Sequence, residues 1–261
     1  EFNLTIYVFG ETPWGDRNGG TLSDDDITNL TIYLQIFHDI NLTRDRLMHC
    51  VSTVARRNSF HPVRDYLNGL KHDGKPRLHL LLVNYLKCDP ASRQWAEIIG
   101  RKFMVSAVAR IMEPGCKADC MLIWEGDQGL GKSQAARALC GPEYLMEGLS
   151  DFHNDDTRLA MQGKWIVEIA ELTAFKQARY QEQIKYFVSQ TVDRFRIRYE
   201  KLPQDFPRQC VFIGTTNQTV DTLADATGNR RFWPVLLTEI DLAAIERDRD
   251  QLWAEAVAMY R

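Results

Sequence analysis

Hydrophobic and polar positions follow two periods along this chain, one typical of helices and one typical of buried strands. Apolar residues recur at helical spacing from Ile27 to Phe37, after a serine, Ser23, that suits a helix N-cap. The same spacing predicts further helices over residues 43–57, from residue 61, and over residues 78–86 and 92–111. A short apolar run at residues 4–9, followed by a stretch rich in glycine and proline, indicates an edge strand.

The pattern changes after Pro114 and Gly115, which break the preceding helix. Short apolar runs then predict strands at residues 121–124, 165–169, 194–199, 210–217 and 232–237. Helical spacing predicts helices over residues 132–140, 175–189 and 242–260. Alternation of strands and helices implies an α/β fold with a mainly parallel sheet and a site at the carboxyl ends of its strands. We therefore expect three parts, an edge segment at 1–22, a helical region at 23–115 and an α/β domain at 116–261.

The segment between the first strand of the α/β domain and the helix after it fits G-x-x-x-x-G-K-[ST], the pattern of a phosphate-binding loop (P-loop). Its residues, with the next one in the helix, are Gly126, Asp127, Gln128, Gly129, Leu130, Gly131, Lys132, Ser133 and Gln134. Glycines let backbone N–H groups close around phosphates, and the helix N-terminus adds a positive dipole end. Lys132 is expected to reach the β- and γ-phosphates of a nucleoside triphosphate, and Ser133 to bind Mg²⁺.

Polar residues that end two other apolar strands extend this expected site. Glu168 comes at the end of one strand, where an acid can hold Mg²⁺ through water, and Glu171 follows three residues later. Glu171 could activate the attacking water, although the two roles could be exchanged. Asn217 ends another strand, where its amide can bond both the γ-phosphate and the water.

Two arginines, Arg230 and Arg231, follow a Gly-Asn turn just before the last strand. A guanidinium with paired donors suits a transferring phosphoryl group and can come from the same subunit or from a neighbour. We expect at least one of the two arginines to form a structural ion pair instead.

A row of cations lies on the strand expected at 194–199. Period-two geometry places Arg194, Arg196 and Arg198 on one face, with Tyr199 and Lys201 next to them. Such a row can follow a nucleic-acid backbone while the tyrosine stacks on a base. A solvated strand face paired with acids is the competing interpretation.

Composition limits the partners and the cellular location that can be expected. The net charge of −3 gives no global field that would attract a polyanion, so nucleic-acid contacts must come from local patches. No apolar run is long enough to cross a bilayer and no signal-peptide pattern opens the chain, so we expect a cytoplasmic protein without membrane contact. Six cysteines without a C-x-x-C pair are typical of reduced thiols. Because the chain begins at Glu1, we expect it to be a fragment, and whether domains precede it stays open.

Five sequence blocks in this order resemble the virulence-associated protein E family of phage and mobile-element ATPases. The blocks are HPVRDYLNGLKHDGKPRL (61–78), EPGCKADCMLIWEGDQGLGKS (113–133), GKWIVEIAEL (163–172), DRFRIRYEKLPQDFPRQCVFIGTTN (193–217) and TGNRRFWPV (227–235). The resemblance covers about residues 24–255. It implies an AAA+-like P-loop NTPase core, similar to superfamily 3 helicases, after an N-terminal helical region.

The resemblance also implies roles for individual residues. Lys132 and Ser133 match the Walker A pair, and Glu168 with Glu171 match the Walker B acids. Asn217 matches the sensor asparagine, and Arg230 or Arg231 matches the arginine that contacts the γ-phosphate. Because the Walker B element is E-x-x-E rather than two adjacent acids, the catalytic base stays open between Glu168 and Glu171.

The expected function is an ATP-driven DNA helicase or replication initiator. ATP and Mg²⁺ are its expected cofactors, single-stranded DNA or a replication fork its partner, and a homo-oligomeric ring its assembly. The alternative is a nucleotide-switched binding protein, which binds ATP tightly without driving movement. A small-molecule kinase fits poorly, since its chemistry gives the Thr-Thr-Asn element no role.

Overall fold

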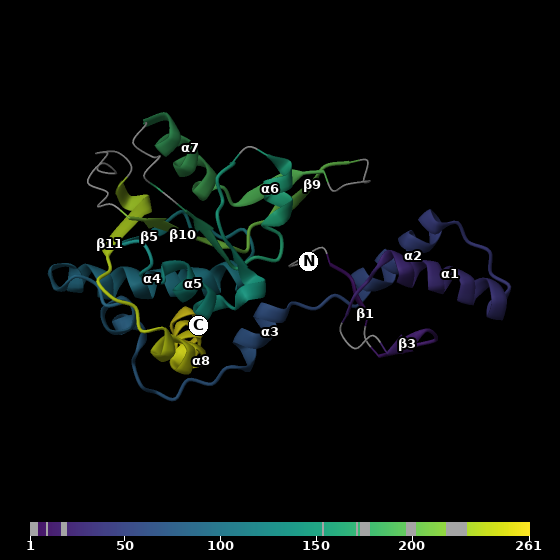
Figure 1. The fold of residues 1–261 in the computed structure, drawn as a ribbon, viewed down its shortest axis with the longest axis horizontal. Coiled ribbons are helices and arrows are strands. Elements are labelled where there is room, and N and C mark those ends of the chain that lie inside the picture. The colour runs from purple at the N-terminus through teal and green to yellow at the C-terminus, as the bar shows by residue number, and fades with distance from the viewer. Residues whose placement is uncertain are drawn as a thin grey trace. The chain divides into compact units, whose positions relative to one another are not determined.

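The computed structural model describes residues 5–8, 10–16, 20–152, 154–170, 172, 178–196, 202–217 and 229–261 (Figure 1). The chain divides into two compact units, Glu1–His61 and Pro62–Arg261. Each unit is therefore taken by itself.

The first unit is built on two helices, α1 (Asp24–His38) and α2 (Arg44–Arg57), as the spacing predicts. Ser23 caps α1 through a capping box with Asp26, whose buried carboxylate also accepts a hydrogen bond from Trp14. The described part of the edge strand expected at residues 4–9 forms one short strand, and the stretch rich in glycine and proline after it forms three more, in two antiparallel pairs. These short strands are β1 (Tyr7–Val8) with β4 (Gly20–Thr21), and β2 (Glu11–Thr12) with β3 (Gly15–Asp16).

The second unit is an α/β fold with a five-stranded parallel sheet in the order β11-β5-β10-β7-β6. The strands are β5 (Met121–Glu125), β6 (Leu145–Met146), β7 (Ile166–Ile169), β10 (Val211–Thr216) and β11 (Phe232–Leu236). Every residue of β5, β7 and β10 is buried, which explains their nearly continuous apolar sequence. The predicted parallel sheet is confirmed; β6 was missed because two residues give no period.

Helices cover both faces of this sheet. One face carries α7 (Ala178–Ser189), and the other carries α4 (Arg93–Met112), α5 (Lys132–Cys140) and α8 (Leu242–Tyr260), as Figure 1 shows. The remaining helical segments are α3 (Pro62–Gly69), α6 (Asp155–Ala160) and the single turns η1 (Leu78–Leu80), η3 (Pro90–Ser92), η4 (Pro142–Tyr144) and η7 (Asn229–Arg231). The helix expected at 78–86 forms instead as η1 followed by a π-helical turn, η2 (Leu81–Tyr85), closed by a bond from the Leu86 amide to the Leu81 carbonyl.

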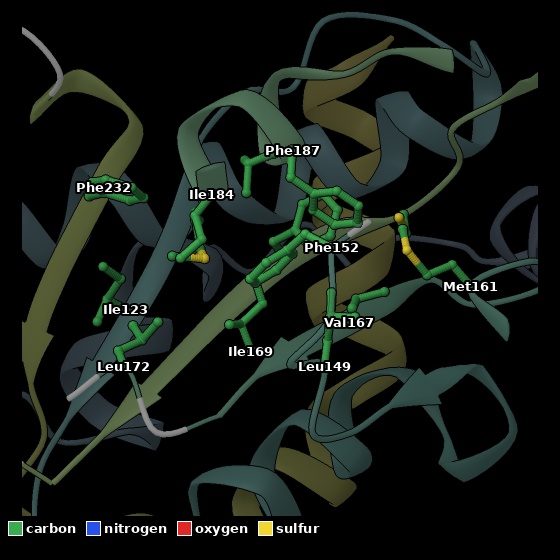
Figure 2. Close-up of a cluster of buried hydrophobic side chains, with 14 residues drawn as sticks. Ile123, Leu149, Phe152, Met161, Val167, Ile169, Leu172, Ile184, Phe187 and Phe232 are labelled. Carbon is green, nitrogen blue, oxygen red and sulfur yellow. The ribbon is translucent and has the colours of Figure 1, made fainter. Parts of the chain in front are cut away.

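The core beneath α7 follows the pleat of the strands. Ile123, Val167 and Ile169 point toward Ile184 and Phe187 of α7 (Figure 2). Alternate strand residues such as Glu168 and Thr215 point to the opposite face, where α5 lies. The pleat therefore separates an apolar face from a face that can carry polar groups.

Trp253 of α8 joins the helices of that opposite face. It is fully buried and stacks on Trp165, with ring centroids 4.0 Å apart. Its indole nitrogen donates to the carbonyl of Leu139, in the last turn of α5, at 2.8 Å. The position of α5 along the sheet thus depends on α8.

The compact units divide at residue 61, not at the expected position near residue 115. Helix α4 packs against α8 and the sheet, and its Arg110 is fully buried. The Arg110 guanidinium donates to the carbonyls of Ala118 and Arg208 at 3.2 and 3.4 Å, which ties α4 to the strand connections. The Pro-Gly break thus ends a helix without ending a packing unit, and the edge segment belongs with α1 and α2.

We predict that Trp253→Ala lowers the free energy of unfolding by about 3–5 kcal/mol, because it leaves a large cavity and removes a buried hydrogen bond. Denaturant titration measures this. Tyr186→Ala, at a side chain that is 71% exposed on α7, is the control and should change stability by less than about 0.5 kcal/mol. A loss below about 1 kcal/mol for Trp253→Ala would contradict its anchoring role.

Candidate phosphate-binding site

The strand order brings three chain segments to one edge of the sheet. Because β10 lies between β5 and β7, the carboxyl ends of these parallel strands are adjacent. The segment after β5 is the predicted phosphate loop, β7 ends near Glu168, and β10 ends at Thr216 followed by Asn217. The predicted residues Lys132, Glu168 and Asn217 therefore meet at one place.

The loop after β5 is shaped by glycines. Gly126 has φ +148, and a Cβ built there would lie 2.7 Å from the carbonyl oxygen of Leu237. Gly131, with φ +94, is the N-cap of α5 and provides no side-chain cap. The amides of the first turn of α5 therefore have no capping side chain and can donate to an anion.

Lys132 begins α5 and folds back over the loop. Its ammonium donates to the carbonyls of Gly126 and Asp127 at 2.7 and 2.9 Å and to Oδ1 of Asn217 at 3.4 Å. Burial lowers the pKa of Lys132, and the carboxylates of Asp127 and Glu168 act in the opposite direction. The lysine is thus held at the loop by acceptors that a phosphate oxygen could replace.

Glu168 is the buried acid of the site, with 2% of its surface exposed. Its Oε1 accepts hydrogen bonds from the hydroxyls of Ser133 and Thr215, both at 2.8 Å. The first bond joins the start of α5 to the end of β7. Sequence reasoning predicted the neighbourhood of Ser133 and Glu168 but gave Thr215 no role; its signal is the polar ending of an apolar strand.

A cavity of about 600 Å³ opens over these residues. Its lining consists of Gln128, Gly129, Leu130, Gly131, Lys132, Ser133, Gln134, Glu168, Ala170, Thr215, Thr216 and Asn217. Lys132 is the only basic residue among these described lining residues. An anion with several oxygens fits this combination of one ammonium, amide donors and hydroxyls.

A divalent cation fits this site only when it binds together with such an anion. Among the described residues, no group of three or more His, Cys, Asp or Glu side chains could hold a metal. Mg²⁺ commonly binds one or two protein oxygens and completes its shell with phosphates and water. Ser133 and Glu168 are the residues that would hold it here.

The two arginines lie at the other end of the sheet. Phe232, directly after Arg231, is level with Met121 at the start of β5, whereas the cavity lies past Glu125. About 13 Å of strand, four steps of about 3.3 Å, separates the two ends. The predicted arginines therefore do not line this cavity.

Arg230 and Arg231 also differ from each other. Arg231 donates to the hydroxyl of Ser189 at 2.9 Å and lies 3.9 Å from the carboxylate of Asp119. The side chain of Arg230 is exposed and has no hydrogen bond or ion pair to a described residue. This agrees with the expectation that at least one of the two arginines is structural, and the contacts identify Arg231 as that residue.

The predicted cationic strand is the first strand of a hairpin, β8 (Val192–Phe195) with β9 (Gln204–Pro207). Arg194 in β8 and Arg196, one residue past its end, are both exposed, as period two predicts, and Arg194 lies 3.5 Å from Asp205. On the inner face Asp193 is buried and pairs with Arg208 at 2.7 Å. Four predicted residues, Arg198, Tyr199, Lys201 and the acid Glu171, lie outside the described residues.

Comparison with known proteins assigns the chain to a family. The Virulence-associated protein E-like domain matches residues 67–261, and this chain belongs to that family. The predicted resemblance is confirmed. No curated protein matches the chain.

Two of the solved structures that match are similar to the chain at low identity. One is described as "The A form apo structure of NrS-1 C terminal region-CTR", with 18% identity, a TM-score of 0.49, and coverage of 73% of this chain and 48% of that one. The other, the same region described as residues 305–718, has 18% identity, a TM-score of 0.47, and coverage of 72% and 46%. This chain thus spans about half the length of the solved structures that it matches. Within the described residues, no helix is long and apolar enough to span a bilayer.

We predict that Gly126→Ala destabilises the protein more than Gly129→Ala does. Both changes force a side chain into a positive φ, but only at Gly126 would the new methyl group meet a backbone oxygen, that of Leu237. The expected losses of unfolding free energy are about 3 kcal/mol at Gly126 and about 1 kcal/mol at Gly129. Urea unfolding of the two variants tests this, and equal losses would mean that the loop does not depend on that close approach.

Proposed function

We propose that this protein is an ATP-hydrolysing P-loop motor that acts on DNA during replication of a phage or mobile element. The observation that carries the proposal is the convergence of Lys132, Ser133 and Glu168 on one cavity. Membership of the virulence-associated protein E-like family supports the same assignment.

The first proposed step is capture of the triphosphate. The amides of residues 126–133 cradle the phosphates, and Lys132 exchanges its backbone acceptors for β- and γ-phosphate oxygens. Ser133, with Glu168 beside it, would hold Mg²⁺, and the metal would neutralise charge on the same phosphates.

The contacts of Glu168 bear on which of Glu168 and Glu171 is the catalytic base, a choice that the sequence leaves open. Its carboxylate already bonds the hydroxyl that would bind Mg²⁺, so we assign Glu168 to the metal and its bound water. Glu171 is then the proposed base for the attacking water. Asn217 turns its oxygen to Lys132, which leaves its amide N–H groups for the γ-phosphate.

The position of Arg230 favours action on a neighbouring subunit. It is exposed at the amino end of the sheet, whereas the cavity of its own chain opens at the carboxyl end. A second copy that presents Arg230 to this cavity would supply the second cation that the described lining lacks. We therefore propose a homo-oligomer, with a ring as its closed form.

The hairpin of β8 and β9 is the proposed DNA contact. Arg194 in β8 and Arg196 just after it are exposed, and the buried pair of Asp193 and Arg208 fixes the base of the hairpin. Contacts between such arginines and the phosphate backbone of DNA need no net positive charge on the whole protein.

We predict that the wild type hydrolyses ATP with Mg²⁺, that single-stranded DNA stimulates turnover, and that Lys132→Ala lowers turnover by about 10²-fold or more. Phosphate release with and without DNA is the measurement. Lys117→Ala, at a side chain that is 73% exposed, is the control and should behave as the wild type.

Other outcomes separate the candidate functions. Stimulation by DNA should weaken in an Arg194→Ala, Arg196→Ala double variant whose basal turnover is retained. Turnover that ignores nucleic acid would contradict a DNA motor. Tight ATP binding without turnover would instead favour the nucleotide-switched binding protein.

We also predict complementation between two defective variants. Arg230→Ala lowers turnover by about 10³-fold, because it removes the arginine from a neighbour's site while keeping its own cavity intact. Lys132→Ala disables the cavity of its own subunit but still presents Arg230 to a neighbour. Mixing the two should restore part of the turnover, whereas a mixture no more active than its components would contradict action between subunits.

A further inference from the structure

One buried hydroxyl at the site belongs to none of the expected motif roles. Thr215 is the next-to-last residue of β10 and is 6% exposed. Its Oγ1 donates to Oε1 of Glu168 at 2.8 Å. The bond crosses from one strand to its neighbour beneath the cavity that both residues line.

The strand register explains why this hydroxyl faces the acid. Ile213 is paired with Glu168 in the parallel ladder, and Thr215 lies two residues further on the same face of β10. Gly214 between them faces the apolar core, where an added Cβ would lie 2.4 Å from Leu172 Cδ1. A slip of one residue would therefore be blocked by this close packing.

Hydroxyl donors stabilise the buried carboxylate of Glu168. It is almost fully buried, and it forms no ion pair with a described residue. Its Oε1 accepts from both Ser133 and Thr215, whereas no described residue donates to its Oε2. Burying a carboxylate is costly unless hydrogen bonds compensate, so both donors matter.

The two donors are not equivalent once a metal binds. Ser133 is the hydroxyl whose oxygen lone pair Mg²⁺ would take, so Ser133 would serve the metal and donate to Glu168 at the same time. Thr215 is not expected to bind the metal, and it can keep the same bond throughout.

We propose that Thr215 is a positioning residue for magnesium: its hydroxyl holds Oε1 of Glu168 and leaves Oε2 for water bound to the metal. This inference rests on the proposed ATPase function. Its effect should therefore be seen in the magnesium dependence of the site, separately from any change in Tm.

The test compares Thr215→Val, which removes the hydroxyl at nearly constant shape, with Thr215→Ser, which keeps it. Thr31→Val is the matched control, because it removes a partly buried hydroxyl bond to the carbonyl of Ile27 in α1. For each variant we would measure the Mg²⁺ concentration at half-maximal ATP turnover, the Mg²⁺ dependence of binding a non-hydrolysable ATP analogue, and the Tm.

Thr215→Val should raise the half-maximal Mg²⁺ concentration by about tenfold, as expected for the loss of one hydrogen bond to a charged group. Thr215→Ser and Thr31→Val should stay within about twofold of the wild type. A purely structural role would instead lower the Tm and the maximal turnover of Thr215→Val without moving the Mg²⁺ midpoint. That result, or a Thr215→Ser variant as defective as Thr215→Val, would overturn the inference.

The same measurements separate this inference from the proposed function. A wild type that binds the analogue with Mg²⁺ but hydrolyses no ATP would contradict the ATPase, while the binding curves would still test Thr215. A wild type that binds no magnesium-nucleotide complex would overturn both.

Discussion

The hydrogen bond between Ser133 and Glu168 is the contact on which the site depends. It joins the first turn of α5 to the end of β7, and so fixes the phosphate loop against the acid. The bond requires α5 to lie on the side of the sheet toward which Glu168 points, where α8 holds its last turn through Trp253. The pleat of β7 and β10 then directs Glu168 and Thr215 to that side and leaves the other side to an apolar core.

Much of this arrangement could be predicted from the sequence. Apolar runs revealed the strands β5, β7 and β10, since completely buried strands carry little else, and also β11, which is partly buried. The loop glycines and Lys132 were visible as a motif, and polar strand endings indicated Glu168 and Asn217. Parallel strands bring such endings to one edge, which is why local patterns were sufficient for the site.

Long-range packing could not be predicted in this way. The break at Pro114 and Gly115 resembles a linker, yet α4 is tied to the strand connections through Arg110, a contact that spacing does not reveal. Thr215 shares the signal of a polar strand ending, but its contact with the acid follows only from its distance to Glu168. The placement of Arg230 and Arg231 at the opposite end of the sheet follows from the register of β11, which the sequence does not contain.

A structure determined with Mg²⁺ and a non-hydrolysable ATP analogue tests the central claim most directly. The account predicts a γ-phosphate within hydrogen-bonding distance of Lys132 Nζ, and Mg²⁺ about 2.1 Å from Ser133 Oγ with Glu168 beside its waters. Phosphates bound elsewhere, with Lys132 still donating to the carbonyl of Gly126, would contradict it.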